Sequence, residues 1–215
     1  MKYDTILFDL DGTLTDPGEG ITNAVMHALA KKGIFEPDRS KLYRFIGPPL
    51  VESFERFYGF THEEAVQGLA DYREYFGPKG IFENKVLDGV PEMLSALKAS
   101  GRKIVLATSK PELFSRQILE HFDLLRHFDG LHGATMDEKR NKKEEVVAWA
   151  LAHTPDVGRA VMVGDRHHDI DGARANGIDS VGVLFGYGSE EELRAAGATH
   201  LAGTISQLKE LLLEN

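Results

Sequence analysis

The chain has 215 residues, of which 42% are hydrophobic and 27% charged, enough for one hydrophobic core or for one core with a small accessory domain. Its formal net charge of −9 argues against nucleic acid as a partner. It contains no cysteine, which excludes disulfides, thiolate catalysis and cysteine–zinc sites.

The sequence contains no signal for membrane insertion or export. No run of apolar residues approaches the roughly 18 that a transmembrane helix needs. The first residues enter a strand pattern without the features of a signal peptide. We therefore expect a cytoplasmic protein with no membrane partner. A monomer is the simplest expectation for its assembly, and a dimer is the alternative.

The first predicted element is a strand at about residues 3–9, and two aspartates lie at its end. Because positions i and i+2 of a strand face the same side, Asp9 and Asp11 project together. Two carboxylates this close repel each other unless a cation or a shared proton separates their roles. Asp is unfavourable in strands, so the pair indicates a functional site. The alternative is a strand that ends in a solvated Asp-Gly turn.

Between about residues 16 and 80 the sequence predicts helices and no strand. Thr61 and Glu64 have the spacing of a capping box, which predicts that a helix begins there. Gly47-Pro48-Pro49 predicts a rigid turn between helices. Apolar residues recur at helical spacing in two stretches, namely Ile21, Val25, Ala28 and Leu29, and Leu50, Val51, Phe54, Phe57 and Tyr58.

From Val86 onward, strands alternate with helices, which is typical of a parallel sheet built from βαβ units. The predicted fold class is α/β, with a Rossmann-like parallel sheet core of residues 1–15 and 82–215 and an inserted all-helical domain of residues 16–81. Further strands are expected at about residues 103–108, 128–132, 160–164, 180–183 and 199–201. Helices are expected at about residues 90–100, 111–121, 143–153, 170–176, 189–196 and 204–213.

Polar residues follow two more of the predicted strands. Thr108 ends one of them, and Asp165 and Asp169 follow another. Between them the basic cluster of residues 139–143 opens a helix. Because ligands collect beyond the carboxyl ends of parallel strands, these residues and Asp9 describe one site. Carboxylates suit a hard cation, and a hydroxyl and a lysine suit the oxygens of a phosphate monoester.

Together these motifs resemble those of phosphatases of the haloacid dehalogenase superfamily, in the subgroup with a helical cap inserted after the first motif. The resemblance covers essentially the whole chain and is nearest in kind to phosphoglycolate phosphatase-like members. It implies Mg²⁺-dependent hydrolysis of a small-molecule phosphomonoester through an aspartyl-phosphate intermediate. The substrate would be a phosphoglycolate-like compound, a sugar phosphate or a nucleoside monophosphate. The positions that carry the resemblance are Asp9-Leu10-Asp11-Gly12-Thr13, Thr108, a lysine near 143, Gly164-Asp165, Asp169, Asp16-Pro17-Gly18 and Gly186-Tyr187-Gly188.

The resemblance also implies roles for the residues of the first motif. Asp9 would attack phosphorus and become phosphorylated. Asp11 would protonate the leaving oxygen and then take a proton from the attacking water. Gly12 would permit a tight turn, and Thr13 would hold Asp11 in place. The resemblance also implies that Asp9 and Asp11 contribute to the metal site.

Mg²⁺ would bridge Asp9 and a phosphate oxygen, as the resemblance implies. Asp165 would be a further ligand, with the backbone carbonyl of Leu10 or Asp11 nearby. Asp169 would either bind the metal directly or contact the residues and waters that bind it, and the sequence leaves both open. For Asp165 the alternative is a helix N-cap, which is a common use of this residue type.

The phosphate would be bound by residues of the second and third motifs. The Thr108 hydroxyl would donate to a phosphate oxygen, with the Ser109 amide or hydroxyl beside it, although Thr108 is also a candidate cap for the next helix. Counted back from the apolar pair Val146-Val147, Lys143 fits the position of the motif lysine better than Lys142 does. The proline-rich spacing that usually follows this lysine in the family is missing.

The stiff stretch of residues 44–49 in the insert is the best candidate for facing the site. Within it, Arg44 either meets an anionic tail of the substrate or is a surface arginine. Since caps of this family close over the active site and supply specificity, a small cap favours small metabolites as substrates.

Two other functions fit parts of the sequence. A phosphosugar mutase of the β-phosphoglucomutase type usually carries a histidine where this chain has Ile21, and lacks the arrangement Gly-Asp-x-x-x-Asp found at residues 164–169. A non-catalytic protein that binds a phosphorylated ligand would normally have lost Asp9, Asp11 or Asp165, and all three are present. Both comparisons favour hydrolysis.

Overall fold

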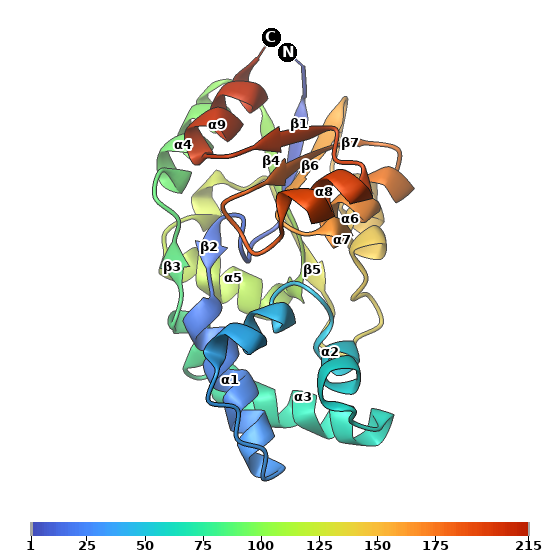
Figure 1. Cartoon of the computed structure of the whole chain (residues 1–215). Coiled ribbons are helices and arrows are strands. Elements are labelled where there is room, and N and C mark those ends of the chain that lie inside the picture. Colours follow the sequence, from blue (N-terminus) through green and yellow to red (C-terminus); the bar gives the residue numbers. More distant parts are fainter. Residues whose placement is uncertain (1, 215) are drawn as a thin grey trace. The chain divides into compact units, whose positions relative to one another are not determined.

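The computed structural model describes residues 2–214, and these divide into two compact units (Figure 1). One unit comprises the chain up to Thr15 and from Val86 onward, and the other is Asp16–Lys85. The chain passes between the units twice. At these crossings β2 (Thr15–Asp16) and β3 (Lys85–Val86) form a two-stranded sheet.

The first unit is built on a six-stranded sheet with the order β5-β4-β1-β6-β7-β8. Neighbouring strands are parallel throughout, which confirms the predicted α/β fold with a parallel sheet core. In the central strand, Phe8 pairs with Leu106 on one side and with Val163 on the other. This register brings the carboxyl ends of three strands to one edge. The strands are β1 (Thr5–Phe8), β4 (Lys103–Pro111), β5 (Gly130–Ala134), β6 (Ala160–Gly164), β7 (Asp179–Val183) and β8 (His200–Ala202).

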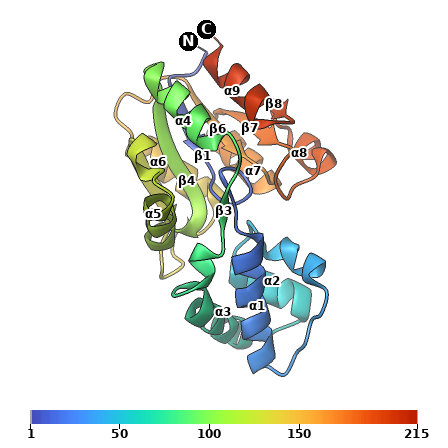
Figure 2. The same ribbon diagram turned by 90° about the vertical axis from the view of Figure 1, so that its left-hand side faces the viewer.

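Helices cover the sheet. Among the described residues of this unit the α-helices are α4 (Val90–Ala99), α5 (Glu112–His121), α6 (Lys143–Ala152), α7 (His167–Ala175), α8 (Glu190–Ala196) and α9 (Ile205–Leu213), with the 3₁₀ helix η3 (Leu125–His127). Figure 2 shows α4 and α9 side by side, and α6 packs against α7. Within residues 2–214, no helix has the length and apolarity needed to cross a bilayer.

The core of the first unit follows from strand alternation. Leu7, Val105 and Met162 belong to one buried cluster with Val146 and Ala150 of α6. Since alternate residues of a strand face opposite sides, their neighbours in β1, β4 and β6 face the other side of the sheet. Both sets are buried, which explains why these strands are continuously apolar.

The second unit, Asp16–Lys85, is helical. It consists of α1 (Gly18–Lys31), the 3₁₀ helix η1 (Arg39–Phe45), α2 (Leu50–Tyr58), α3 (His62–Phe76) and the 3₁₀ helix η2 (Gly80–Phe82). α3 packs against both α1 and α2. The apolar residues predicted to line one face of the first helix are buried, namely Ile21, Val25, Ala28 and Leu29. Phe45 packs edge-on against Phe54 and Phe57 in the interior of this unit.

The second boundary differs from the one predicted, which lay between residues 81 and 82. Residues 82–85 belong to the helical unit instead. The reason is Glu83, whose side chain accepts hydrogen bonds from Asn23 at 2.9 Å and from the Tyr75 hydroxyl at 3.0 Å. Its carbonyl oxygen accepts from the backbone N–H of Gly20 at 3.0 Å. These contacts tie the segment after η2 to α1 and α3.

The capping box at the start of α3 yields a prediction about stability. The Thr61 hydroxyl accepts from the Glu64 backbone N–H at 3.3 Å, and the Glu64 carboxylate accepts from the Thr61 N–H at 3.0 Å. Replacing Thr61 by Ala should lower the free energy of unfolding by about 1 kcal/mol, because a helical N–H loses its partner. Urea denaturation followed by circular dichroism measures the change. Thr61→Ser should restore the wild-type value, and equal stability of all three proteins would contradict the prediction.

Candidate active site

Three buried carboxylates come together at the carboxyl edge of the sheet. Asp9 follows β1, Asp165 follows β6, and Asp169 lies in the first turn of α7. Each offers one oxygen, and these oxygens all lie within 4.8 Å of one another. The Asp9 N–H donates to the Val163 carbonyl at 2.9 Å, so the backbone ladder between β1 and β6 continues up to the carboxylate. The sheet itself therefore fixes where Asp9 stands.

Lys143, the first residue of α6, neutralises part of this charge. Its Nζ lies 2.8 Å from Oδ1 of Asp9 and 2.8 Å from Oδ1 of Asp169, and donates to the Ala107 carbonyl at 3.2 Å. Only 4% of the side chain is exposed. Burial alone would lower the pKa of Lys143, but the two carboxylates outweigh it and raise that pKa. The side chain is thus an ammonium. Lys142, the alternative left open by the sequence, is exposed.

The charge in this cluster is unbalanced. Three carboxylates and one ammonium carry a net charge of −2 when ionised. Burial, and then the charges of Asp169 and Asp9, raise the pKa of Asp165 well above its usual range. Burial likewise raises the pKa of Asp169, to about 6. A buried set of oxygen donors with two surplus negative charges fits a divalent cation, which would hold these carboxylates in their ionised form.

Asp11 stands apart from this cluster. Its Oδ2 lies 2.8 Å from Nζ of Lys110, and both side chains are buried. Burial raises the pKa of Asp11, whereas the Lys110 ammonium opposes that rise. Asp11 is therefore not one of the three carboxylates whose oxygens lie within 4.8 Å of one another.

No role was predicted for Lys110 from the sequence. A signal was available, because Thr108 and Lys110 are two residues apart in the extended chain of β4 and so share one side of the strand. A lysine on the same side as a predicted phosphate ligand is unusual in an otherwise buried strand. Thr108 is buried, and its Oγ1 accepts from the Lys110 N–H at 3.2 Å. The N-cap of α5 is Pro111, so Thr108 does not cap that helix.

The turn after Asp11 is packed against Asp165. Gly12 has φ +79°, and a Cβ at this position would lie 2.3 Å from Oδ2 of Asp165, so the turn requires glycine. The Thr13 hydroxyl was expected to hold Asp11. It instead donates to Oδ1 of Asp165 across 3.5 Å, because the turn directs it toward the end of β6. The first motif and the fourth are thereby packed directly together.

α7 begins at His167, earlier than the predicted start at residue 170. Its first turn includes Asp169, whose Oδ2 accepts from the Arg166 N–H at 3.1 Å. The N-cap position is taken by Arg166, so Asp165 is not the N-cap that the sequence left as an alternative. Both carboxylates of the fourth motif are therefore directed to the site.

Ser109 and Arg44 complete the set of predicted site residues. Ser109 follows Thr108 in β4 and is half-buried. Arg44 lies in η1 of the helical unit, where its guanidinium is 4.3 Å from the centre of the Phe57 ring.

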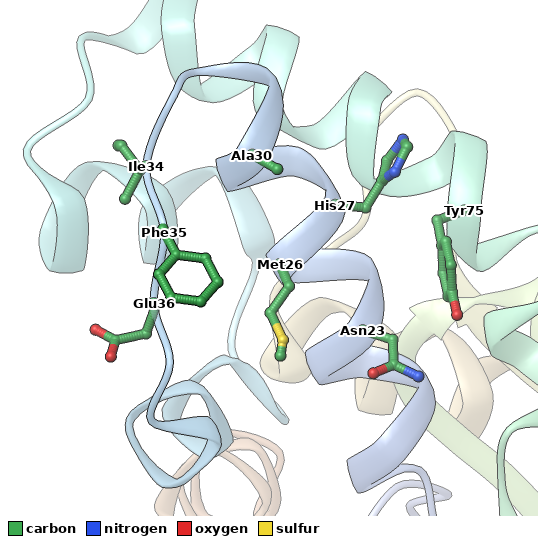
Figure 3. A pocket seen from close by; sticks show the side chains of 8 residues that line it. All are labelled: Asn23, Met26, His27, Ala30, Ile34, Phe35, Glu36 and Tyr75. Atoms are coloured by element: carbon green, nitrogen blue, oxygen red, sulfur yellow. The ribbon is translucent and has the colours of Figure 1, made fainter.

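The helical unit also has a hollow on its own surface, with a volume of about 390 Å³ (Figure 3). It is lined by Asn23, Met26, His27, Ala30, Ile34, Phe35, Glu36 and Tyr75. None of the predicted site residues is among them. The hollow is therefore separate from the carboxylate cluster described above.

The chain belongs to the haloacid dehalogenase-like hydrolase family, which it matches over residues 6–183. The predicted family is thus confirmed, and the protein is a phosphoric monoester hydrolase of this family. It is 46% identical over 213 residues to a 5'-nucleotidase of Pseudomonas aeruginosa, covering 99% of this chain and 96% of that protein. It is 40% identical over 210 residues to the tyrosine-protein kinase PtkA of Mycobacterium tuberculosis, covering 96% of this chain and 72% of that protein. The crystal structure of a predicted phosphatase from Clostridium acetobutylicum matches with a TM-score of 0.96 at 46% identity, covering 99% of each chain.

The contrast between the two adjacent lysines yields a second prediction. Replacing Lys143 by Met should lower kcat/KM for a generic aryl phosphate by about 100-fold or more, because a buried charge beside Asp9 is lost. Phosphate release measures the rate, and circular dichroism verifies that the variant is folded. Lys142→Met should keep a rate within about twofold of wild type, since an exposed charge contributes little. Equal losses in both variants would contradict the assignment of Lys143.

Proposed function

We propose that this protein is a magnesium-dependent phosphatase that hydrolyses small phosphomonoesters through a phosphorylated Asp9. The observation that carries the proposal is the buried group of Asp9, Asp165 and Asp169 around Lys143. Phosphoryl transfer requires a positioned nucleophile and compensation of the charge on the phosphate oxygens, and this group supplies both. Mg²⁺, held by Asp9 and Asp165 with Asp169 as a direct or outer ligand, would neutralise charge on the phosphate oxygens.

In the first step a carboxylate oxygen of Asp9 attacks phosphorus, and the bond to the leaving oxygen breaks. Lys143 keeps the Asp9 carboxylate oriented from 2.8 Å and adds positive charge beside it. The Thr108 hydroxyl and the Ser109 amide or hydroxyl donate to phosphate oxygens. Gly12 allows the turn over Asp165 that the approach to the site requires.

Asp11 is the general acid and then the general base. It gives its proton to the leaving oxygen in the first step. In the second step it takes a proton from the water that attacks the phosphorylated Asp9, which releases inorganic phosphate and restores the carboxylate. Lys110, 2.8 Å from Oδ2, keeps the Asp11 side chain in place.

Nucleoside monophosphates are the substrate class we favour. The support comes from the relative named 5'-nucleotidase, which is 46% identical over nearly the whole of both chains. A phosphoglycolate-like compound and a sugar phosphate are the alternatives. The product pair would be inorganic phosphate and a nucleoside.

A second candidate function comes from the relative named tyrosine-protein kinase, which is 40% identical over 210 residues. In that reaction phosphate would pass from a nucleoside triphosphate to a tyrosine hydroxyl. The same phosphorylated Asp9 would serve it, with the hydroxyl taking the place of water. The experiment that tests hydrolysis can separate the two outcomes.

The third prediction tests the nucleophile and the metal together. Phosphate release is measured over a panel of phosphorylated metabolites, with magnesium and with EDTA. Wild-type protein should be active with magnesium and inactive in EDTA. Asp9→Asn should lose activity by about 10⁴-fold or more, because no nucleophile remains. Asp156→Asn is the matched control, since this carboxylate is 99% exposed, and it should behave as wild type.

Three results would contradict the proposal. Full activity in EDTA would exclude the proposed role of the metal. Appreciable turnover by Asp9→Asn would exclude Asp9 as the nucleophile. If no compound of the panel released phosphate, and tyrosine were labelled from a nucleoside triphosphate in the presence of magnesium, the kinase reaction would be favoured. A strong preference for nucleoside monophosphates would support the favoured substrate class.

Arg44 is the proposed contact for an anionic part of the substrate, and this yields the fourth prediction. Arg44→Ala should raise KM for substrates with an anionic tail by about 10-fold, with a smaller effect on a generic aryl phosphate. Arg56→Ala is the matched control, because its guanidinium also lies over the Phe57 ring, at 5.6 Å. Steady-state kinetics on both substrates measure the effect. Equal changes for both substrates would exclude Arg44 from the substrate-binding residues.

A further inference from the structure

One oxygen of Glu192, a residue in the first turn of α8, accepts hydrogen bonds from three donors. The donors are Nε of Arg166 at 3.0 Å, the backbone N–H of His167 at 2.9 Å and Nδ1 of His167 at 2.8 Å. Three donors on one carboxylate oxygen make a strong, charge-assisted contact. Neither the fold nor the proposed reaction has so far required this contact.

The two donor residues immediately follow Asp165 and precede Asp169 in the chain. Oδ2 of Asp169 accepts from the backbone N–H of Arg166 at 3.1 Å, so the same residue contacts Glu192 through its side chain and Asp169 through its backbone. Residues 165–169, the turn from β6 into the start of α7, are therefore held by Glu192 of α8. The sequence separation of 25 residues between His167 and Glu192 makes this a tertiary tether.

A second contact holds the same turn. The backbone N–H of Tyr187 donates to Oδ2 of Asp165 at 2.7 Å. This close approach depends on Gly186, where a Cβ would lie 2.4 Å from the Cβ of Asp165. The segment from Gly186 to Glu192 thus contacts Asp165 directly and contacts the two residues that follow it, Arg166 and His167.

We propose that Glu192 is a positioning residue that fixes Asp165 and Asp169 through Arg166 and His167, and thereby sets the affinity of the site for its divalent cation. The inference rests on the proposed function, because it requires that these carboxylates hold a cation. Glu192 acts through its neighbours and is not itself placed among the ligands.

The physical reason is the repulsion among the carboxylates. When no cation is bound, Asp9, Asp165 and Asp169 repel one another, and contacts that hold the backbone of residues 165–169 oppose that repulsion. Asp9 and Asp165 each follow a strand of the sheet, whereas Asp169 lies in the first turn of α7. Hydrogen bonds from His167 and Arg166 lower the pKa of Glu192 to about 2 against the opposing effect of burial, so the tether keeps its charge at neutral pH. A turn that is already held in place before the cation binds needs less rearrangement of its carboxylates on binding.

The fifth prediction is a change in magnesium affinity. Isothermal titration calorimetry with MgCl₂ is carried out on the EDTA-treated, dialysed full-length chain without substrate. Glu192→Ala should weaken binding by about 10- to 100-fold, the range typical of residues that orient metal ligands. Glu192→Gln keeps the size and one acceptor oxygen but loses the charge, and should weaken binding by a smaller factor. Glu191→Gln is the matched control, an exposed neighbour in the same helix, and should bind as wild type.

The outcomes separate this inference from the proposed function. A wild-type chain that binds no magnesium would overturn both. Wild-type binding with an unchanged Kd in both Glu192 variants would overturn the inference alone. Thermal unfolding of each metal-free variant provides the structural control, and titrations are run well below its Tm. A lower Tm with an unchanged Kd would assign Glu192 to stability only, and would likewise overturn the inference.

Discussion

The site depends on one buried ion pair arrangement, in which the Lys143 ammonium lies between the carboxylates of Asp9 and Asp169. Without it, three acidic groups within 4.8 Å would be held together against their mutual repulsion and their loss of hydration. The lysine offsets one charge and leaves two. The two remaining negative charges suit the divalent cation of the proposed reaction, so the same ion pairs bear on both the stability of the protein and its proposed chemistry.

A second buried pair, Lys110 with Asp11, separates the two acidic residues of the first motif. Asp9 lies with Asp165, Asp169 and the Lys143 ammonium, whereas Asp11 is buried beside the Lys110 ammonium. Two carboxylates two residues apart thus have different surroundings. The proposed roles of nucleophile and proton donor at one pH require such a difference in surroundings. The division arises because Lys143 comes from the start of α6, whereas Lys110 comes from β4.

The sequence was sufficient for the α/β class, the parallel sheet and the approximate bounds of its elements, because buried strands and amphipathic helices have distinct periodicities. It also named the three aspartates that the structure brings within 4.8 Å, since each follows a strand of one sheet. It could not supply the partners of those aspartates. The contacts of Asp11 with Lys110, of Thr13 with Asp165 and of Glu192 with His167 depend on how separate segments approach one another, which local patterns do not encode. The last residues of the helical unit depend on contacts of the same kind, because Glu83 is held by side chains of α1 and α3.

The pairing of β2 with β3 means that the chain leaves the sheet unit and returns to it at neighbouring points, where the N–H of Leu87 donates to the Leu14 carbonyl at 3.1 Å. Because the inserted segment starts and ends at neighbouring points, the fold does not require it to have a particular length. The sheet would close around the same two ends whether the inserted segment were short or long, since closure entropy grows only slowly with loop length. The fold therefore permits recombination: evolution, or an engineer, could exchange the segment Asp16–Lys85 for another and keep the catalytic edge unchanged.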